Sequence, residues 1–153
     1  MHDLPRQLSA AELARVFEGR TRLVERLTGC VDPLGDAETV LRDAPEDELV
    51  EALNTHPRIG ARTLSARSAR EQGKEEDPAV LAELARLNER YEETFGFRFV
   101  VFVKGRPRSE ILQVLRRRIT RSRQQELRTA IIDLFAIAAD RYRTMMRAGS
   151  PPQ

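Results

Sequence analysis

Residues 127–145, LRTAIIDLFAIAADRYRTM, decide the fold class of this 153-residue chain. Apolar side chains recur there at helical spacing, in the stripe Leu127, Ile131, Leu134, Ala138 and Met145. This spacing puts them on one face of a helix, which we expect over residues 124–147. Arg141 lies inside the stripe and needs a partner, because an unpaired buried charge is strongly disfavoured. Spacing alone favours a structural ion pair or a side chain reaching the edge of the stripe, and leaves a clamp on a bound anion or carbonyl open.

Helical patterns and capping signals cover most of the remaining chain. Ser9 and Glu12 form a capping box before the first helix, and Gly96 ends a long one that begins at Pro78. Further helices are expected over residues 21–27, 36–41, 45–56, 61–72 and 109–119. The sequence therefore predicts an all-α bundle of about seven to eight helices. It forms a single domain over residues 1–153, with its core at about 8–147 and a flexible tail at 148–153.

Residues 97–103, FRFVVFV, are the exception to this helical pattern. They are rich in β-branched and aromatic residues and are followed by the turn signal KGRP, which is typical of a strand and a turn. No other segment has the pattern of a pairing strand, so the backbone N–H and C=O groups need other partners. Loops and helix caps could supply them, and so could a small ligand rich in amide groups. We expect one buried extended segment here.

Composition limits the classes of protein. The chain has 26 basic and 24 acidic residues, and its single cysteine, Cys30, has no partner for an internal disulfide or a metal site. No apolar run approaches the length of a membrane span or a signal peptide, so we expect a cytoplasmic protein without membrane contact. The cluster Arg116–Arg118, with Arg121 and Arg123, could contact phosphates, but is more typical of a solvated helix face paired with neighbouring acids.

His56 is the first candidate for acid–base chemistry, because an unperturbed histidine titrates near neutral pH and the only other one is His2 at the chain start. Pro57 should end the preceding helix and push His56 into extended geometry. A helix-end histidine that only bonds to backbone is the alternative. In the expected helix 61–72, Ser68, Glu71 and Gln72 stand at i, i+3 and i+4 and share one face, a pattern also common on solvated helices.

These pieces occur together in a recognisable order. HPRIG (56–60), SAREQG (68–73), LNERYEETFGFRFVVFVKGR (87–106), ILQVLRRRI (111–119) and IAADRYR (137–143) give a chain that resembles the OHCU decarboxylases over roughly residues 8–147. That family acts on 2-oxo-4-hydroxy-4-carboxy-5-ureidoimidazoline, a product of urate oxidation. The resemblance implies an all-α fold and cofactor-free loss of CO2 that gives (S)-allantoin, with neither metal nor prosthetic group.

The resemblance also assigns site residues. It implies that His56 and Glu71 form a catalytic pair that protonates one face of the ring. It implies substrate contacts by the remaining matched positions, which are Pro57, Ser68, Gln72, Phe99, Val100, Val101, Phe102, Val103 and Arg141. It further suggests a homodimer. A functional association with urate oxidase and hydroxyisourate hydrolase stays open at this point. A ureide-binding or related ring-processing protein on the same scaffold stays open, as does a basic helical protein that binds nucleic acid.

Overall fold

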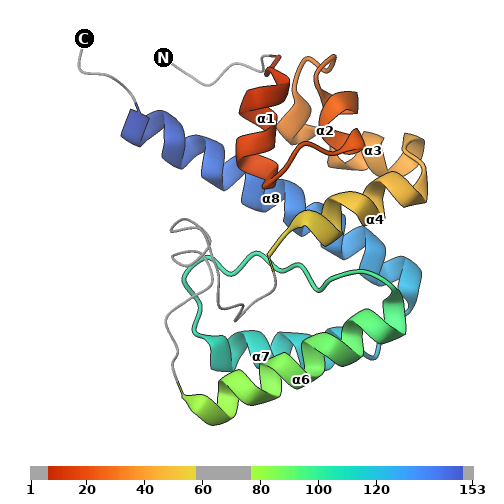
Figure 1. The fold of residues 1–153 in the computed structure, drawn as a ribbon, viewed down its shortest axis with the longest axis vertical. Coiled ribbons are helices and arrows are strands. Elements are labelled where there is room, and N and C mark those ends of the chain that lie inside the picture. Colours follow the sequence, from red (N-terminus) through yellow and green to blue (C-terminus); the bar gives the residue numbers. More distant parts are fainter. Residues whose placement is uncertain (1–6, 58–76, 150–153) are drawn as a thin grey trace.

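The computed structural model describes residues 7–57 and 77–149, which fold as α-helices joined by loops (Figure 1). In these residues there are seven α-helices, one 3-10 helix and no strand, so the all-α prediction is confirmed. The helices are α1 (Ala10–Phe17), α2 (Arg22–Leu27), η1 (Pro33–Gly35), α3 (Ala37–Asp43), α4 (Glu46–Thr55), α6 (Pro78–Phe95), α7 (Arg108–Arg118) and α8 (Arg123–Gly149). The helix expected over residues 61–72 lies outside the described residues.

The helix ends follow local capping chemistry. At α1 the Ser9 amide donates to Glu12 Oε1 (2.9 Å) and the Glu12 amide donates to Ser9 Oγ (3.1 Å), which is the predicted capping box. Gly96 ends α6 with a left-handed φ of 84°. Asp36 stands at the N-cap of α3, but its side chain makes no capping bond. α8 reaches Gly149, so the first two residues of the expected tail belong to this helix.

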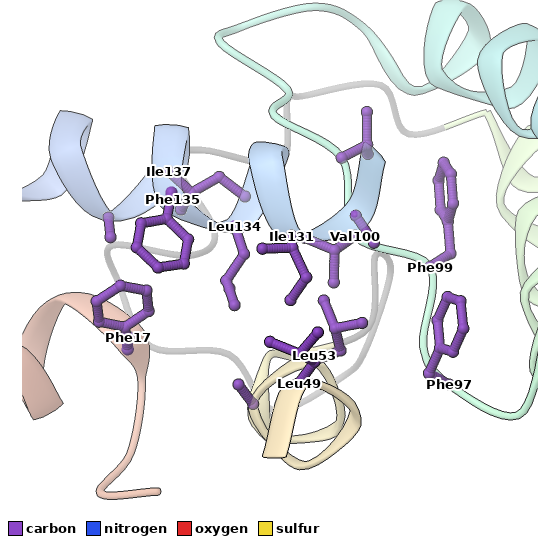
Figure 2. Packing of buried hydrophobic residues seen from close by; sticks show 14 of the residues in the cluster. Phe17, Leu49, Leu53, Phe97, Phe99, Val100, Ile131, Leu134, Phe135 and Ile137 are labelled. Carbon is purple, nitrogen blue, oxygen red and sulfur yellow. The ribbon is translucent and has the colours of Figure 1, made fainter. Parts of the chain in front are cut away.

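The long helix α8 carries most of the packing (Figure 1). α1, α3 and α4 pack on it, α2 packs on α1 and α4, and α6 pairs with α7. Figure 2 shows Leu49 and Leu53 of α4 facing Ile131 of α8, with Val100 beside them. Among the described residues, no helix combines the length and apolar character needed to cross a membrane.

The loop between α1 and α2 lies tightly against the end of α4. Glu18 ends α1 in the left-handed region, with a φ of 65°, and Gly19 follows with a φ of 158°. A Cβ atom on Gly19 would lie 2.5 Å from Thr55 Cγ2, so only glycine fits this approach. The same loop carries Glu18, whose Oε2 lies 3.5 Å from Nη2 of Arg141 in α8.

Residues 97–103 run across the molecule without regular secondary structure (Figure 1). Phe97, Phe99, Val100, Val101 and Val103 are buried, which confirms the buried segment. The expected turn follows, with left-handed φ angles of 49° at Lys104 and 78° at Gly105. Within the described residues the segment pairs with no strand, so its strand-like composition reflects burial of its side chains.

The arginine cluster forms the expected solvated face paired with acids, except at Arg118. Arg118 is buried, and Arg116 lies 3.7 Å from Glu83. Arg121 and Arg123 are exposed, and pair with Glu126 (3.0 Å) and Glu46 (2.6 Å). Most of this positive charge is therefore committed to carboxylates of the same chain.

Candidate functional site

His56 lies at the point where α4 ends. Its backbone is extended (φ −73°, ψ 138°), as Pro57 predicts, and its amide donates to the Leu53 carbonyl (3.2 Å). Its side chain is buried, with 7% of the residue exposed. Nδ1 of the imidazole has no hydrogen-bond partner within the described part of the chain. A buried polar atom of this kind is available to a ligand.

The surroundings of His56 favour a neutral imidazole. Burial, and then the positive charges of Arg141 and Arg98, lower the pKa of His56 from 6.5 to about 3. At neutral pH the ring therefore carries one N–H donor and one acceptor nitrogen, and no net charge. Such a group starts a reaction by accepting a proton or by donating a neutral hydrogen bond.

Arg141 projects from α8 into the interior and is only 1% exposed. Its Nη1 donates to the Val16 carbonyl (3.1 Å), and its Nη2 lies 3.5 Å from Glu18 Oε2. The structural pairing favoured by its position in the apolar stripe therefore exists, and the C-terminal end of α1 supplies the partners. The same guanidinium also acts on His56 through its charge, so the structure brings Arg141 and His56 into one environment.

Side chains hold the backbone of residues 100–103. Arg118 Nη1 donates to the Val100 carbonyl (2.9 Å), and the Phe102 amide donates to Asp133 Oδ2 (3.0 Å). Arg106 donates to the carbonyls of Phe102 (2.6 Å) and Val103 (3.1 Å). The guanidinium fork suits this task, because it can reach two acceptors at once.

Phe99 and Val101 differ from their neighbours in this segment. Neither makes a main-chain hydrogen bond with another described residue, although both are buried. Val101 lies between the two positions that Arg118 and Asp133 hold. Its amide and carbonyl are therefore fixed in place and available to a ligand that carries complementary amide groups.

A buried polar network packs against the segment 97–103. Arg118 pairs with Glu126 (2.8 Å) and lies over the Phe99 ring, with 4.7 Å between the guanidinium carbon and the ring centroid. The Tyr91 hydroxyl donates to Glu126 Oε1 (2.5 Å). Burial and this bond raise the pKa of Tyr91, so it stays protonated.

Sequence reasoning missed most of the polar residues around the site, and three of them differ in the signal they offer. Arg118 follows Ile111 and Leu115 at helical spacing, so the argument used for Arg141 could have found it. Asn54 and Arg98 had no comparable signal, because the contacts of Arg98 with Asn54 and His56 span 44 and 42 residues.

The described residues hold part of the predicted site. They contain His56 and Pro57 at the end of α4, Arg141 on α8 and the segment 99–103. Ser68, Glu71 and Gln72 lie outside the described residues. In residues 7–57 and 77–149 no three His, Cys, Asp or Glu side chains gather in a metal-binding arrangement.

Comparison with known sequences gives consistent matches. The family model described as OHCU decarboxylase matches residues 3–143. The uric acid degradation bifunctional protein PucL of Bacillus subtilis (strain 168) is 35% identical over 130 residues, which are 81% of this chain and 24% of that protein. The 2-oxo-4-hydroxy-4-carboxy-5-ureidoimidazoline decarboxylase of Haloferax volcanii is 34% identical over 114 residues, 71% of this chain and 68% of that enzyme. The chain thus spans about a quarter of PucL.

Two solved structures share the fold. The crystal structure of an OHCU decarboxylase in the presence of (S)-allantoin superposes with a TM-score of 0.71 and 22% identity, covering 92% of this chain and 99% of that one. An (S)-allantoin synthase gives a TM-score of 0.63 and 21% identity, covering 88% of this chain and 48% of that one. At this level of identity the likeness concerns the helical architecture.

Proposed function

The chain belongs to the OHCU decarboxylase family, and we propose that it removes CO2 from 2-oxo-4-hydroxy-4-carboxy-5-ureidoimidazoline to give (S)-allantoin. The enzyme is then a carboxy-lyase of urate breakdown. The observation that carries the proposal is the buried His56, with an unpartnered Nδ1 in the described part of the chain and with Arg141 close by. A structural histidine would satisfy its buried nitrogen within the fold.

The chemistry of the substrate defines what the protein must do. The ring carbon that loses the carboxylate also carries a hydroxyl group. When the C–C bond breaks, its electron pair forms a C=C bond to the neighbouring ring carbon, and the C=N pair of that carbon moves onto the ring nitrogen, which takes up a proton from solvent. The hydroxyl proton then leaves, the carbonyl of allantoin forms, and a proton adds to the neighbouring carbon. The protein must orient the carboxylate, accept one proton and deliver one to a single face.

His56 suits the proton-accepting step. As a neutral imidazole it can take the hydroxyl proton at neutral pH, which an imidazolium could not do. The resulting imidazolium can then supply the proton that adds to the ring. Glu71 is proposed as its partner, which fixes the imidazole tautomer or holds the substrate hydroxyl or ureido N–H.

The remaining contacts position the ring. Arg141 is proposed to bind an oxygen whose negative charge grows as CO2 leaves, because holding the ground-state carboxylate would oppose the reaction. The Val101 backbone, between the positions that Arg118 and Asp133 hold, would bond to ring amides. Pro57, Ser68 and Gln72 complete the proposed pocket, together with the other residues of 99–103.

The wider setting is proposed from the relatives. The name of PucL describes a bifunctional protein of uric acid degradation, which supports a functional association of this chain with urate oxidase and hydroxyisourate hydrolase. We also propose a cytoplasmic homodimer built from single-domain chains. Nucleic-acid binding has less support, since Arg116, Arg118 and Arg123 pair with carboxylates of the same chain.

The direct test supplies the unstable substrate in situ from urate and follows allantoin by circular dichroism. Protein-dependent formation of one enantiomer is expected. The His56→Asn variant should lower the rate about 10²- to 10⁴-fold, the usual contribution of a positioned acid–base group. Racemic allantoin at the buffer rate from the wild-type protein would reject the decarboxylase, and ureide binding without turnover would favour the ureide-binding alternative.

A further inference from the structure

We propose that Asn54 and Arg98 are positioning residues that fix His56 relative to the extended segment 97–103. The inference rests on the proposed catalytic role of His56. The Arg98 amide donates to Asn54 Oδ1 (2.9 Å), and Arg98 Nη1 donates to the His56 carbonyl (2.9 Å). Each of the two chain segments thus supplies one side-chain group and one backbone group to the contact. Two bonds between the same segments restrain rotation as well as distance.

His56 needs this restraint because of where it lies. It follows the last turn of α4 and precedes Pro57, so its carbonyl has no amide of a continuing helix to bond. Its Nδ1 has no partner in the described part of the chain. The orientation of the imidazole therefore depends on its backbone and on packing. Arg98 is the group that fixes that backbone from the opposite side.

The charge of Arg98 reinforces its geometric role. Together with burial and Arg141, it lowers the pKa of His56 and keeps the imidazole neutral. On the helix that precedes His56, Glu51 of α4 is engaged by Arg22. Burial is the larger cause, so removing Arg98 should disturb the position of His56 while the imidazole stays neutral at pH 7, and a lysine at this position keeps the charge.

The chain offers a matched control at the start of the same segment. Arg123 Nε donates to the Phe95 carbonyl (2.8 Å), its guanidinium lies over Phe97 (5.4 Å), and it pairs with Glu46 (2.6 Å). Arg123→Met removes the same kind of side chain and carbonyl bond, but touches neither His56 nor residues 99–103. A general loss of stability would affect both arginine variants alike.

The test compares Arg98→Met, Asn54→Ala and their double variant with Arg123→Met in the allantoin assay. We expect kcat to fall about 10- to 100-fold in each of the first two with little change in KM, because an error near 1 Å in a catalytic group can cost about 10²-fold. The kcat of the double variant should be close to that of either single variant, because both substitutions disrupt the same contact between α4 and the segment. Asn54→Asp retains the hydrogen-bond acceptor and should keep most of the activity. Arg98→Lys retains the positive charge and should keep the wild-type pH profile of kcat.

A second measurement separates this inference from the proposed function. Carbon–proton NMR signals of the His56 ring at pH 7 should shift in Arg98→Met and Asn54→Ala, and stay in place in Arg123→Met. If the wild-type protein shows no decarboxylation, the proposed function fails, and the NMR comparison still tests the pair. Equal kcat and unchanged His56 signals in Arg98→Met and Arg123→Met would overturn the inference. If Arg98→Met does not fold, Asn54→Ala, which changes an exposed side chain, decides it.

Discussion

Arg118 of α7 and Glu126 of α8 form an ion pair inside the protein, with 2.8 Å between Nε and Oε1 and side chains 7% and 0% exposed. Tyr91 and Arg121 also bond to the Glu126 carboxylate, and Arg118 bonds to the Val100 carbonyl. Charges this deeply buried persist only when they are paired and hydrogen-bonded. The pair therefore links the helices α6, α7 and α8 to the segment that borders the candidate site.

Removing one partner of this pair should be strongly destabilising. Arg118→Met leaves the Glu126 charge buried, and we expect the free energy of unfolding to fall by about 3 to 5 kcal/mol. Arg121→Met is the control, because Arg121 contacts the same carboxylate from a half-exposed position and should cost less than about 1 kcal/mol. Urea denaturation followed by circular dichroism measures both. If both variants lose the same free energy of unfolding, burial of Arg118 does not explain the stability of the pair.

The protonation of His56 should make stability depend on pH. Its pKa is about 3 in the folded protein, against the 6.5 of an unperturbed histidine, so the unfolded chain binds the proton first. The stabilisation is present above pH 6.5 and is lost as pH falls toward 3. One such group gives a slope of about 1.4 kcal/mol per pH unit in that window.

The variant His56→Asn isolates this contribution. The wild type should lose roughly 1 kcal/mol more stability than the variant between about pH 7 and about pH 5.5. Carboxylates titrate in both proteins and cancel in the difference. Parallel pH–stability curves would mean that the pKa of His56 is the same in the folded and the unfolded protein, and would contradict the lowering ascribed to burial.

Arg141→Lys tests the guanidinium fork separately from its charge. The lysine keeps the positive charge near His56 but cannot reach the same two acceptors. We expect kcat/KM to fall about 10- to 100-fold, the range for one charge-assisted hydrogen bond. Arg143→Lys, an exposed position on the same helix, should leave kcat/KM unchanged. Wild-type kinetics from Arg141→Lys would argue against contact with the substrate.

Asp133 should influence substrate binding through the backbone that it holds. Asp133→Leu removes the acceptor for the Phe102 amide, and we expect KM to rise about 2- to 10-fold, which corresponds to one ordinary hydrogen bond. Asp133→Asn keeps an oxygen at this position and should retain a near-normal KM. Steady-state kinetics of the two variants provides the comparison, and identical KM values would separate the segment from substrate recognition.

Much of the fold follows from local patterns. The capping box at Ser9, the left-handed Gly96 and the stripe on α8 are set by neighbouring residues, and the structure contains each of them. The extended geometry of His56 follows from Pro57 for the same reason. These features need no knowledge of distant contacts.

The polar partners could not be predicted in this way. Glu18 reaches Arg141 across 123 residues, and Asp133 reaches Phe102 across 31. Sequence spacing shows that Arg141 needs a partner, but tertiary packing selects which carboxylate approaches. The run of neighbouring arginines predicts a solvated face for Arg118, whereas its helical phase after Ile111 and Leu115 places it in the core. The roles of Ser68, Glu71 and Gln72 stay predictions.

The side-chain ties of residues 97–103 also determine how this part of the protein opens. A paired strand can separate from one neighbour at a time, whereas these residues are tied to Asn54 of α4, Arg118 of α7 and Asp133 of α8. Exposing the segment to solvent therefore requires contacts with three helices to break together. The hydrogen-bonded amides of Arg98 and Phe102 should exchange with solvent deuterium at the slow rate of the global unfolding reaction. Residues 97–103, which border the proposed pocket, are thus among the last parts of the molecule to unfold.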